Sequence, residues 1–272
     1  MDRRLTPATE RVAHISLQGR IDATAFTAGQ SLRVAMPLVD LLRKPGGARE
    51  RQLLLGEGFT VIDRHEGSAF GFAQKDGYCG WLPEAALCEG PAPTHWIATP
   101  GTHLYPEPRV QARELAALSL GAQIHVLGKQ GAFYETSQGF IPASHLRPLS
   151  EHLRDPVTVA EGFLGVPYLW GGNSRAGIDC SGLAQVAHLA CGIAAPGDSD
   201  LQEVMGRALP EDARLRRGDL IFWKGHIALI VDETRLIHAN GHTMSVAYED
   251  TAACIARVQA QNGGPVTHRR RL

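Results

Sequence analysis

Short apolar runs separated by glycine and proline fill the stretch from about residue 30 to 90. Residues 53–55 are three leucines, residues 59–62 read FTVI, and residues 70–73 read FGFA, with turn-forming residues between them. Runs this short with frequent turns are typical of strands in a small all-β module. We therefore predict a small β-barrel or sandwich here, followed by a linker in the proline-rich residues 90–93.

The same pattern returns between about residues 95 and 149. Both segments contain glycine, an aromatic residue, an aliphatic residue and proline in that order, as GWLP at residues 80–83 and GFIP at residues 139–142. This recurrence indicates an internal repeat of one small β module.

The pattern changes after Val157. Apolar residues at helical spacing predict helices over about 158–164 and 179–190. Three apolar runs then predict successive strands at about 220–223, 226–231 and 235–239. Helices followed by antiparallel strands indicate an α+β domain. We expect three domains, over residues 1–92, 93–150 and 151–272.

Composition narrows the class of protein. Apolar residues make up 44% and charged residues 20%, with a net charge of −1. This balance favours neither nucleic acid nor an anionic membrane as a partner. The basic run at residues 269–271 is interpreted as a solvated tail.

Two further features bear on the compartment. No apolar run of signal-peptide or membrane-span length is found near the start or elsewhere, so we expect a cytoplasmic protein. The five cysteines fit neither a zinc site nor a disulfide scaffold and are expected to be free thiols.

One cysteine stands where a turn-rich segment enters a predicted helix. Cys180 lies in the first helical turn, where free backbone amides and the helix dipole lower a thiol pKa and can hold an oxyanion. A buried structural cysteine is the alternative. The adjacent Ser181 either lines a cleft or caps the helix.

Two histidines favour the catalytic interpretation. A three-residue turn at 232–234 pairs Val231 with Arg235 and makes His226 and His238 diagonal neighbours on one sheet face. A four-residue turn would place the rings on opposite faces. With the odd turn, His226 takes the proton of Cys180 and His238 orients His226.

Two other interpretations compete with this one. Either histidine taken alone is an ordinary sheet residue. Zinc bound by Cys180, His226 and His238 is the other alternative, but no further Cys or His lies at ligand spacing from them. We therefore expect neither a metal nor an organic cofactor.

Five segments in this order resemble the NlpC/p60 family of papain-like cysteine peptidases. They are VPYLWGG at 166–172, GIDCSGL at 177–183, RGDLIFW at 217–223, GHIALI at 225–230 and IHA at 237–239. The resemblance implies a papain-like α+β catalytic domain with Cys180 as nucleophile, His226 as base and His238 as the orienting group. It also implies cleavage next to γ-linked D-glutamate in cell-wall stem peptides.

The two β modules resemble bacterial SH3 domains, which gives two SH3-like barrels before the catalytic domain. This combination resembles the cytoplasmic dipeptidyl-peptidase branch, which recycles murein peptides by splitting L-Ala-γ-D-Glu from the next diamino acid. That branch requires a free N-terminal amine on the substrate. The resemblance implies an amine clamp of Glu57, Tyr78 and Asp179, because an ammonium needs acceptors and negative charge.

Two other functions remain open at this point. One is an endopeptidase or amidase acting on intact peptidoglycan, and the other is a non-catalytic peptide-binding protein. The sequence does not fix the oligomeric state, or whether the third substrate residue is diaminopimelate or lysine.

Overall fold

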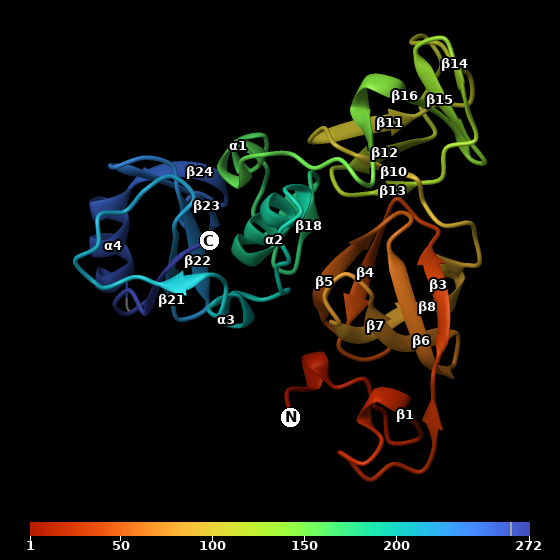
Figure 1. The fold of residues 1–272 in the computed structure, drawn as a ribbon, viewed down its shortest axis with the longest axis horizontal. Helices are drawn as coiled ribbons and strands as arrows, with labels where there is room; N and C mark the ends of the chain where they lie inside the picture. Colours follow the sequence, from red (N-terminus) through yellow and green to blue (C-terminus); the bar gives the residue numbers. More distant parts are fainter. Residues whose placement is uncertain (262) are drawn as a thin grey trace. The chain divides into compact units, whose positions relative to one another are not determined.

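A computed structural model describes residues 1–261 and 263–272 of the chain (Figure 1). The chain folds into two compact units, residues 1–151 and residues 152–272, and each is described by itself. Among the described residues, no helix is both long and apolar enough to cross a membrane.

The first part of unit 1 is a seven-stranded antiparallel sheet in the order β5-β4-β8-β7-β6-β3-β9. Its side chains Leu41, Phe59 and Val61 form a core that excludes water. The strands are β3 (Gln30–Val34), β4 (Leu38–Leu42), β5 (Arg49–Leu54), β6 (Gly58–His65), β7 (Ser68–Ala73), β8 (Cys79–Pro83) and β9 (Leu87–Cys88). Before them lie η1 (Arg3–Leu5), η2 (Ile15–Leu17) and the parallel pair β1 (Ala13–His14) and β2 (Phe26–Thr27).

The second part of unit 1 consists of three small antiparallel sheets around Ile97, Leu118 and Ile141. One sheet has the order β13-β10-β17, one pairs β11 with β12, and one has the order β14-β15-β16. The strands are β10 (His95–Ile97), β11 (Gly101–Leu104), β12 (Ala116–Ser119), β13 (Gln123–Ile124), β14 (Gly128–Gln130), β15 (Phe133–Thr136), β16 (Gly139–Pro142) and β17 (Leu146–Pro148).

The internal repeat predicted from the sequence is confirmed in the backbone. Pro83 ends β8 and caps η3 (Glu84–Ala86), and Pro142 ends β16 and caps η4 (Ala143–His145) in the same way. Each three-residue helix then leads into a short strand, β9 or β17.

The expected all-β, SH3-like architecture of this region is therefore present. The larger sheet begins at β5 and ends at β9, and these two strands are not hydrogen-bonded to each other. The sheet is therefore open, whereas a barrel was predicted. The boundaries of the three domains stay a prediction.

Unit 2 is α+β, as expected. Its sheet is antiparallel in the order β20-β25-β21-β22-β23-β24. Helix α2 packs on β22 and β23, α1 packs on β23, and α4 packs on β24 (Figure 1). The strands are β18 (Asn173–Ser174), β19 (Gly177–Ile178), β20 (Arg207–Ala208), β21 (Leu220–Trp223), β22 (His226–Ile230), β23 (Arg235–Asn240), β24 (Ser245–Asp250) and β25 (His268–Arg271). The helices are α1 (Pro156–Glu161), α2 (Cys180–Ala190), α3 (Ser199–Gln202) and α4 (Thr251–Ala260).

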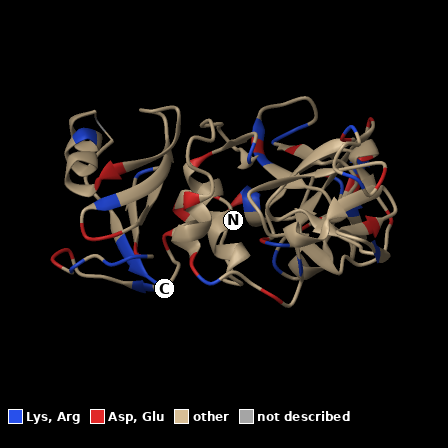
Figure 2. Ribbon diagram, turned by 90° about the horizontal axis from the view of Figure 1, so that it is seen from above, with Lys and Arg blue, Asp and Glu red and all other residues tan. Residues whose placement is uncertain are grey.

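The basic C-terminal run is not a solvated tail, and that interpretation was wrong. The run forms β25, which lies between β20 and β21 in the sheet (Figure 2, blue beside the C-terminus). Arg271 donates to both carboxylate oxygens of the buried Asp219, at 2.7 and 2.6 Å. A buried carboxylate requires such a partner, so the basic residue is part of the structure.

Candidate active site

Asp179 fixes the start of helix α2. Its Oδ1 accepts hydrogen bonds from the Gly182 amide at 2.6 Å and the Ser181 hydroxyl at 2.8 Å, and its Oδ2 accepts from the Gly171 amide at 2.8 Å. The Gly182 bond is the side-chain contact expected of a helix N-cap. Asp179 therefore ties the helix to the preceding loop, and Cys180 occupies the first helical position.

The preceding loop approaches the helix very closely. A Cβ atom added to Gly182 would lie 2.4 Å from the carbonyl oxygen of Gly172. Glycine is therefore required two residues after the cysteine, because any side chain there would push the loop away from the first turn.

We predict that Asp179→Ala lowers the free energy of unfolding by about 2–4 kcal/mol. Loss of the cap costs about 1 kcal/mol, and the Gly171 amide is left buried without its acceptor. Asp179→Asn, which caps as well as aspartate, should lose clearly less. Urea denaturation measures both variants, and an alanine variant as stable as the parent would rule out this structural role.

The sulfur of Cys180 lies against the residues on either side of His226. Its Sγ is 4.0 Å from the carbonyl oxygen of Gly225, and the Ile227 amide stabilises the thiolate form. The amides of Ser181 and Cys180 itself act in the same direction. The fold thus brings the start of α2 to the start of β22.

The expectation of a lowered thiol pKa was wrong. Burial raises the pKa of Cys180 to about 12, and the neighbouring Asp179 charge acts in the same direction. The three backbone amides lower the pKa, but they do not compensate for desolvation. In the resting site the sulfur therefore carries its proton at neutral pH.

The predicted hairpin register is confirmed. The Val231 amide donates to the Arg235 carbonyl oxygen at 2.8 Å, and Ile230 pairs with Leu236, so the turn has three residues. His226 Nε2 and His238 Nδ1 are 2.9 Å apart. The Trp223 ring lies 5.6 Å from the His226 ring, with an angle of 36° between the planes.

Both imidazoles are neutral near pH 7. Burial, together with the nearby His238 and Arg257, lowers the pKa of His226 to about 3. Burial likewise lowers the pKa of His238 to about 4, against the opposing effect of Glu249. A neutral imidazole accepts a proton at one ring nitrogen, so His226 is available as a base.

Sequence reasoning missed two residues that hold His238 from behind. His238 Nε2 is 3.1 Å from Glu249 Oε2, and Arg257 donates to both oxygens of Glu249, at 2.8 and 2.7 Å. Ala247 pairs with His238, so Glu249 is a diagonal neighbour on β24. Extending the hairpin argument by one strand would have found it.

Comparison with known proteins identifies two parts of the chain. The model of the NlpC/P60 family matches residues 165–261, which contain Cys180, both histidines and Glu249. The chain carries an NlpC/P60 domain. A second model, the bacterial dipeptidyl-peptidase SH3 domain, matches residues 41–87 in unit 1.

The chain is similar to two curated proteins and to one solved structure. The gamma-D-glutamyl-L-lysine dipeptidyl-peptidase of Bacillus cereus is 28% identical over 231 residues, which cover 70% of this chain and 67% of that protein. Its Bacillus subtilis counterpart is 30% identical over 183 residues, covering 60% of each chain. The crystal structure of an NlpC/P60 family protein from Bacillus cereus has a TM-score of 0.75 at 21% identity, covering 89% of this chain and 99% of that one. The last likeness shows the fold.

The NlpC/P60 domain contains five of the seven predicted site residues. Asp179, Cys180 and Ser181 are at the start of α2, and His226 stands between Gly225 and Ile227, the two residues whose backbone faces the sulfur. His238 joins them through its bond to His226. Ser181 donates to Asp179, so it belongs to the helix cap.

The other two predicted residues lie in unit 1. Glu57 is 7% exposed, and its carboxylate binds Lys75 Nζ at 2.7 and 2.9 Å and the Leu54 amide at 3.1 Å. Tyr78 is 3% exposed and packs in the sheet core. An ammonium group would have to compete with Lys75 for Glu57. The part of both residues in an amine clamp stays a prediction.

Proposed function

We propose that the chain is a cysteine peptidase that hydrolyses the bond between γ-D-glutamate and the following diamino acid in cell-wall stem peptides. The observation that carries this proposal is the contact of the Cys180 sulfur with the residues flanking His226, whose ring is bonded to His238. The two dipeptidyl-peptidase relatives support the choice of substrate.

The first half of the proposed reaction forms an acyl-enzyme. His226 Nε2 faces His238, so Nδ1 is the nitrogen that takes the Cys180 proton as the sulfur attacks the γ-carbonyl carbon. The amides of Cys180 and Ser181, which face the sulfur, hold the resulting oxyanion. The C–N bond then breaks, and His226 returns its proton to the leaving amine.

The second half restores the enzyme. Water attacks the thioester carbon while His226 takes a proton from it, the C–S bond breaks, and the thiol is regenerated by that proton. Because the resting thiol and imidazole are both neutral, each proton moves only when the nucleophile attacks.

We also propose that the substrate is a small murein peptide with a free N-terminal L-Ala, bound with the help of Asp179, Ser181, Glu57 and Tyr78. Recycling of such peptides takes place in the cytoplasm. All five cysteines are free thiols in the described chain, which supports a reducing compartment.

One comparison of substrates tests this proposal. The protein is incubated with L-Ala-γ-D-Glu-diaminopimelate, the matching lysine peptide, and both peptides with an acetylated amine. We expect cleavage of a free-amine peptide. Acetylation should lower kcat/KM at least about 100-fold, because it removes the substrate's positive charge and leaves the groups that bind the ammonium without their partner.

The other outcomes separate the alternatives. Equal cleavage of free and acetylated peptides contradicts the amine requirement and leaves an endopeptidase acting on intact peptidoglycan. Binding without cleavage of any of the four contradicts the peptidase proposal and leaves a peptide-binding protein.

A further inference from the structure

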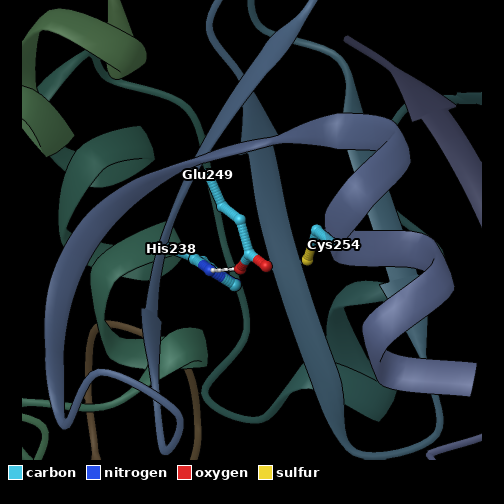
Figure 3. Close-up of side chains that lie close together, drawn as sticks. All are labelled: His238, Glu249 and Cys254. Carbon is cyan, nitrogen blue, oxygen red and sulfur yellow. Dashed lines mark hydrogen bonds and ion pairs between the residues drawn. The ribbon is translucent and has the colours of Figure 1, made fainter. Parts of the chain in front are cut away.

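A carboxylate and a guanidinium lie behind His238, on the side away from His226. Glu249 comes from β24 and Arg257 from α4, and Figure 3 shows Glu249 pointing at the His238 ring with Cys254 beside it. The His238 side chain is completely buried, while those of Glu249 and Arg257 are about one-fifth exposed. The four groups Arg257, Glu249, His238 and His226 form one continuous row of hydrogen bonds.

The direction of each hydrogen bond in this row follows from chemistry. Arginine donates only, and Arg257 holds the pKa of Glu249 down at about 2, so the carboxylate accepts only. His238 must therefore carry its proton on Nε2, which faces Glu249. Because a neutral imidazole carries one ring proton, Nδ1 of His238 is an acceptor.

The same reasoning extends to the base. Since His238 Nδ1 accepts, His226 must donate from Nε2 across the 2.9 Å bond. The single proton of the neutral His226 ring is then on Nε2, and Nδ1 keeps its lone pair. A lone pair on Nδ1 is what a base beside Cys180 requires.

We propose that Glu249, held by Arg257, is a positioning residue that sets the tautomers of His238 and His226 and so keeps His226 Nδ1 ready to accept a proton. The role of His226 Nδ1 as a proton acceptor rests on the proposed function. The tautomers themselves depend only on the hydrogen-bond row.

A metal site is the competing interpretation of this cluster. His238, Glu249 and Cys254 offer three ligand atoms within 4.8 Å of one another. However, the Arg257 guanidinium already binds both Glu249 oxygens and lies 3.6 Å from the Cys254 sulfur. Burial also raises the pKa of Cys254 to about 12, so a metal would have to displace the proton of this thiol as well as compete with Arg257. The fixed positive charge favours the hydrogen-bond row.

The decisive variant is Glu249→Gln. Glutamine matches the shape of glutamate but has one acceptor oxygen, where Glu249 has two that face His238 and Arg257. When that oxygen accepts from Arg257 Nε, the NH2 group faces His238. His238 Nε2 would then accept, both ring protons would move to Nδ1, and His226 would lose its basic nitrogen. We expect kcat to fall about 10- to 100-fold with little change in KM, because Glu249 does not touch the substrate. Glu249→Asp should recover part of the loss.

The matched control is Glu161→Gln. Glu161 also binds an arginine, Arg217, and the Tyr248 hydroxyl, which is on the same strand as Glu249. This pair lies apart from the histidine row, so kcat should stay within about twofold of the parent. A loss equal to that of Glu249→Gln would overturn the proposal, because any lost carboxylate–arginine pair would then have the same effect.

Ring-nitrogen NMR reads the tautomers directly, without substrate. In Cys180→Ala protein, which keeps the row intact, we expect both rings as Nε2–H tautomers, and as Nδ1–H tautomers once Glu249→Gln is added. Nδ1–H rings in the parent overturn the proposal, because Glu249 would then not set the ring protons. The NMR measurement needs no substrate, so it tests the tautomers even if no peptide is cleaved. Failure of the peptidase proposal would be seen in the cleavage assay alone.

Discussion

Replacing Cys180 with alanine is expected to reduce turnover of the free-amine peptide by about 10⁴-fold or more. In the proposed mechanism the Cys180 sulfur is the atom to which the acyl group is bonded, so the acyl-enzyme cannot form without it. Turnover is measured by release of the free diamino acid. The fold should be retained, because alanine fits where a buried cysteine packs.

The pH dependence of stability supplies a control for this variant. The pKa of Cys180 is raised from 9.0 to about 12, so between these values the unfolded state releases a proton that the folded state keeps. Stability therefore falls above pH 9, and Cys180→Ala should lose less stability there than the parent. A variant that retains measurable turnover with unchanged KM contradicts the assignment of the nucleophile.

Acidification is expected to destabilise unit 2 steeply below about pH 6. The unfolded state takes up protons on His226 and His238 near their ordinary pKa of 6.5, while the folded state takes them up only near pH 3 and 4. The unfolded state thus binds more protons in this window, and stability falls as pH falls. Each histidine contributes about 1.4 kcal/mol per pH unit, so the pair contributes about 2.7 kcal/mol per unit between pH 6 and 4.

Glu249 extends this loss to lower pH. Its pKa is lowered from 4.5 to about 2 by Arg257, so its contribution to stability is present above pH 4.5 and is lost as pH falls toward 2. The buried His188, whose pKa is also lowered by desolvation, adds to the loss below pH 6.5.

The variant His226→Gln measures how much His226 alone contributes to the loss of stability in acid. Glutamine does not titrate, so the slope of unfolding free energy against pH should decrease by about 1.4 kcal/mol per unit between pH 6 and 4. Urea denaturation at each pH gives the slope. The same slope in the variant and the parent would show that His226 is already protonated in the folded protein, which contradicts the neutral resting pair.

Local patterns predicted the parts of this site that depend on backbone geometry. The helix start at Cys180 followed from the spacing of apolar residues. Spacing left two turn lengths open before Arg235, and the requirement that both histidines share one sheet face favoured the three-residue turn that the structure has. The diagonal placement of His226 and His238 followed from that register.

Properties that depend on burial were not predictable in this way. The raised pKa of Cys180 reflects how completely the surrounding residues exclude water, which no local sequence pattern encodes. The support of His238 by Glu249 and Arg257 needed the next strand and the helix after it. The run at 269–271 looked like a tail because its partner, Asp219, lies about fifty residues earlier in the chain.

The most direct test of the account is to trap the acyl-enzyme. Protein mixed with the free-amine peptide is quenched in acid on the millisecond timescale, digested and examined by mass spectrometry. The account predicts a mass increase equal to L-Ala-D-Glu less one water, on the fragment that contains Cys180. Turnover of the peptide with this fragment unmodified at every time point, or with the adduct on another residue, would contradict it.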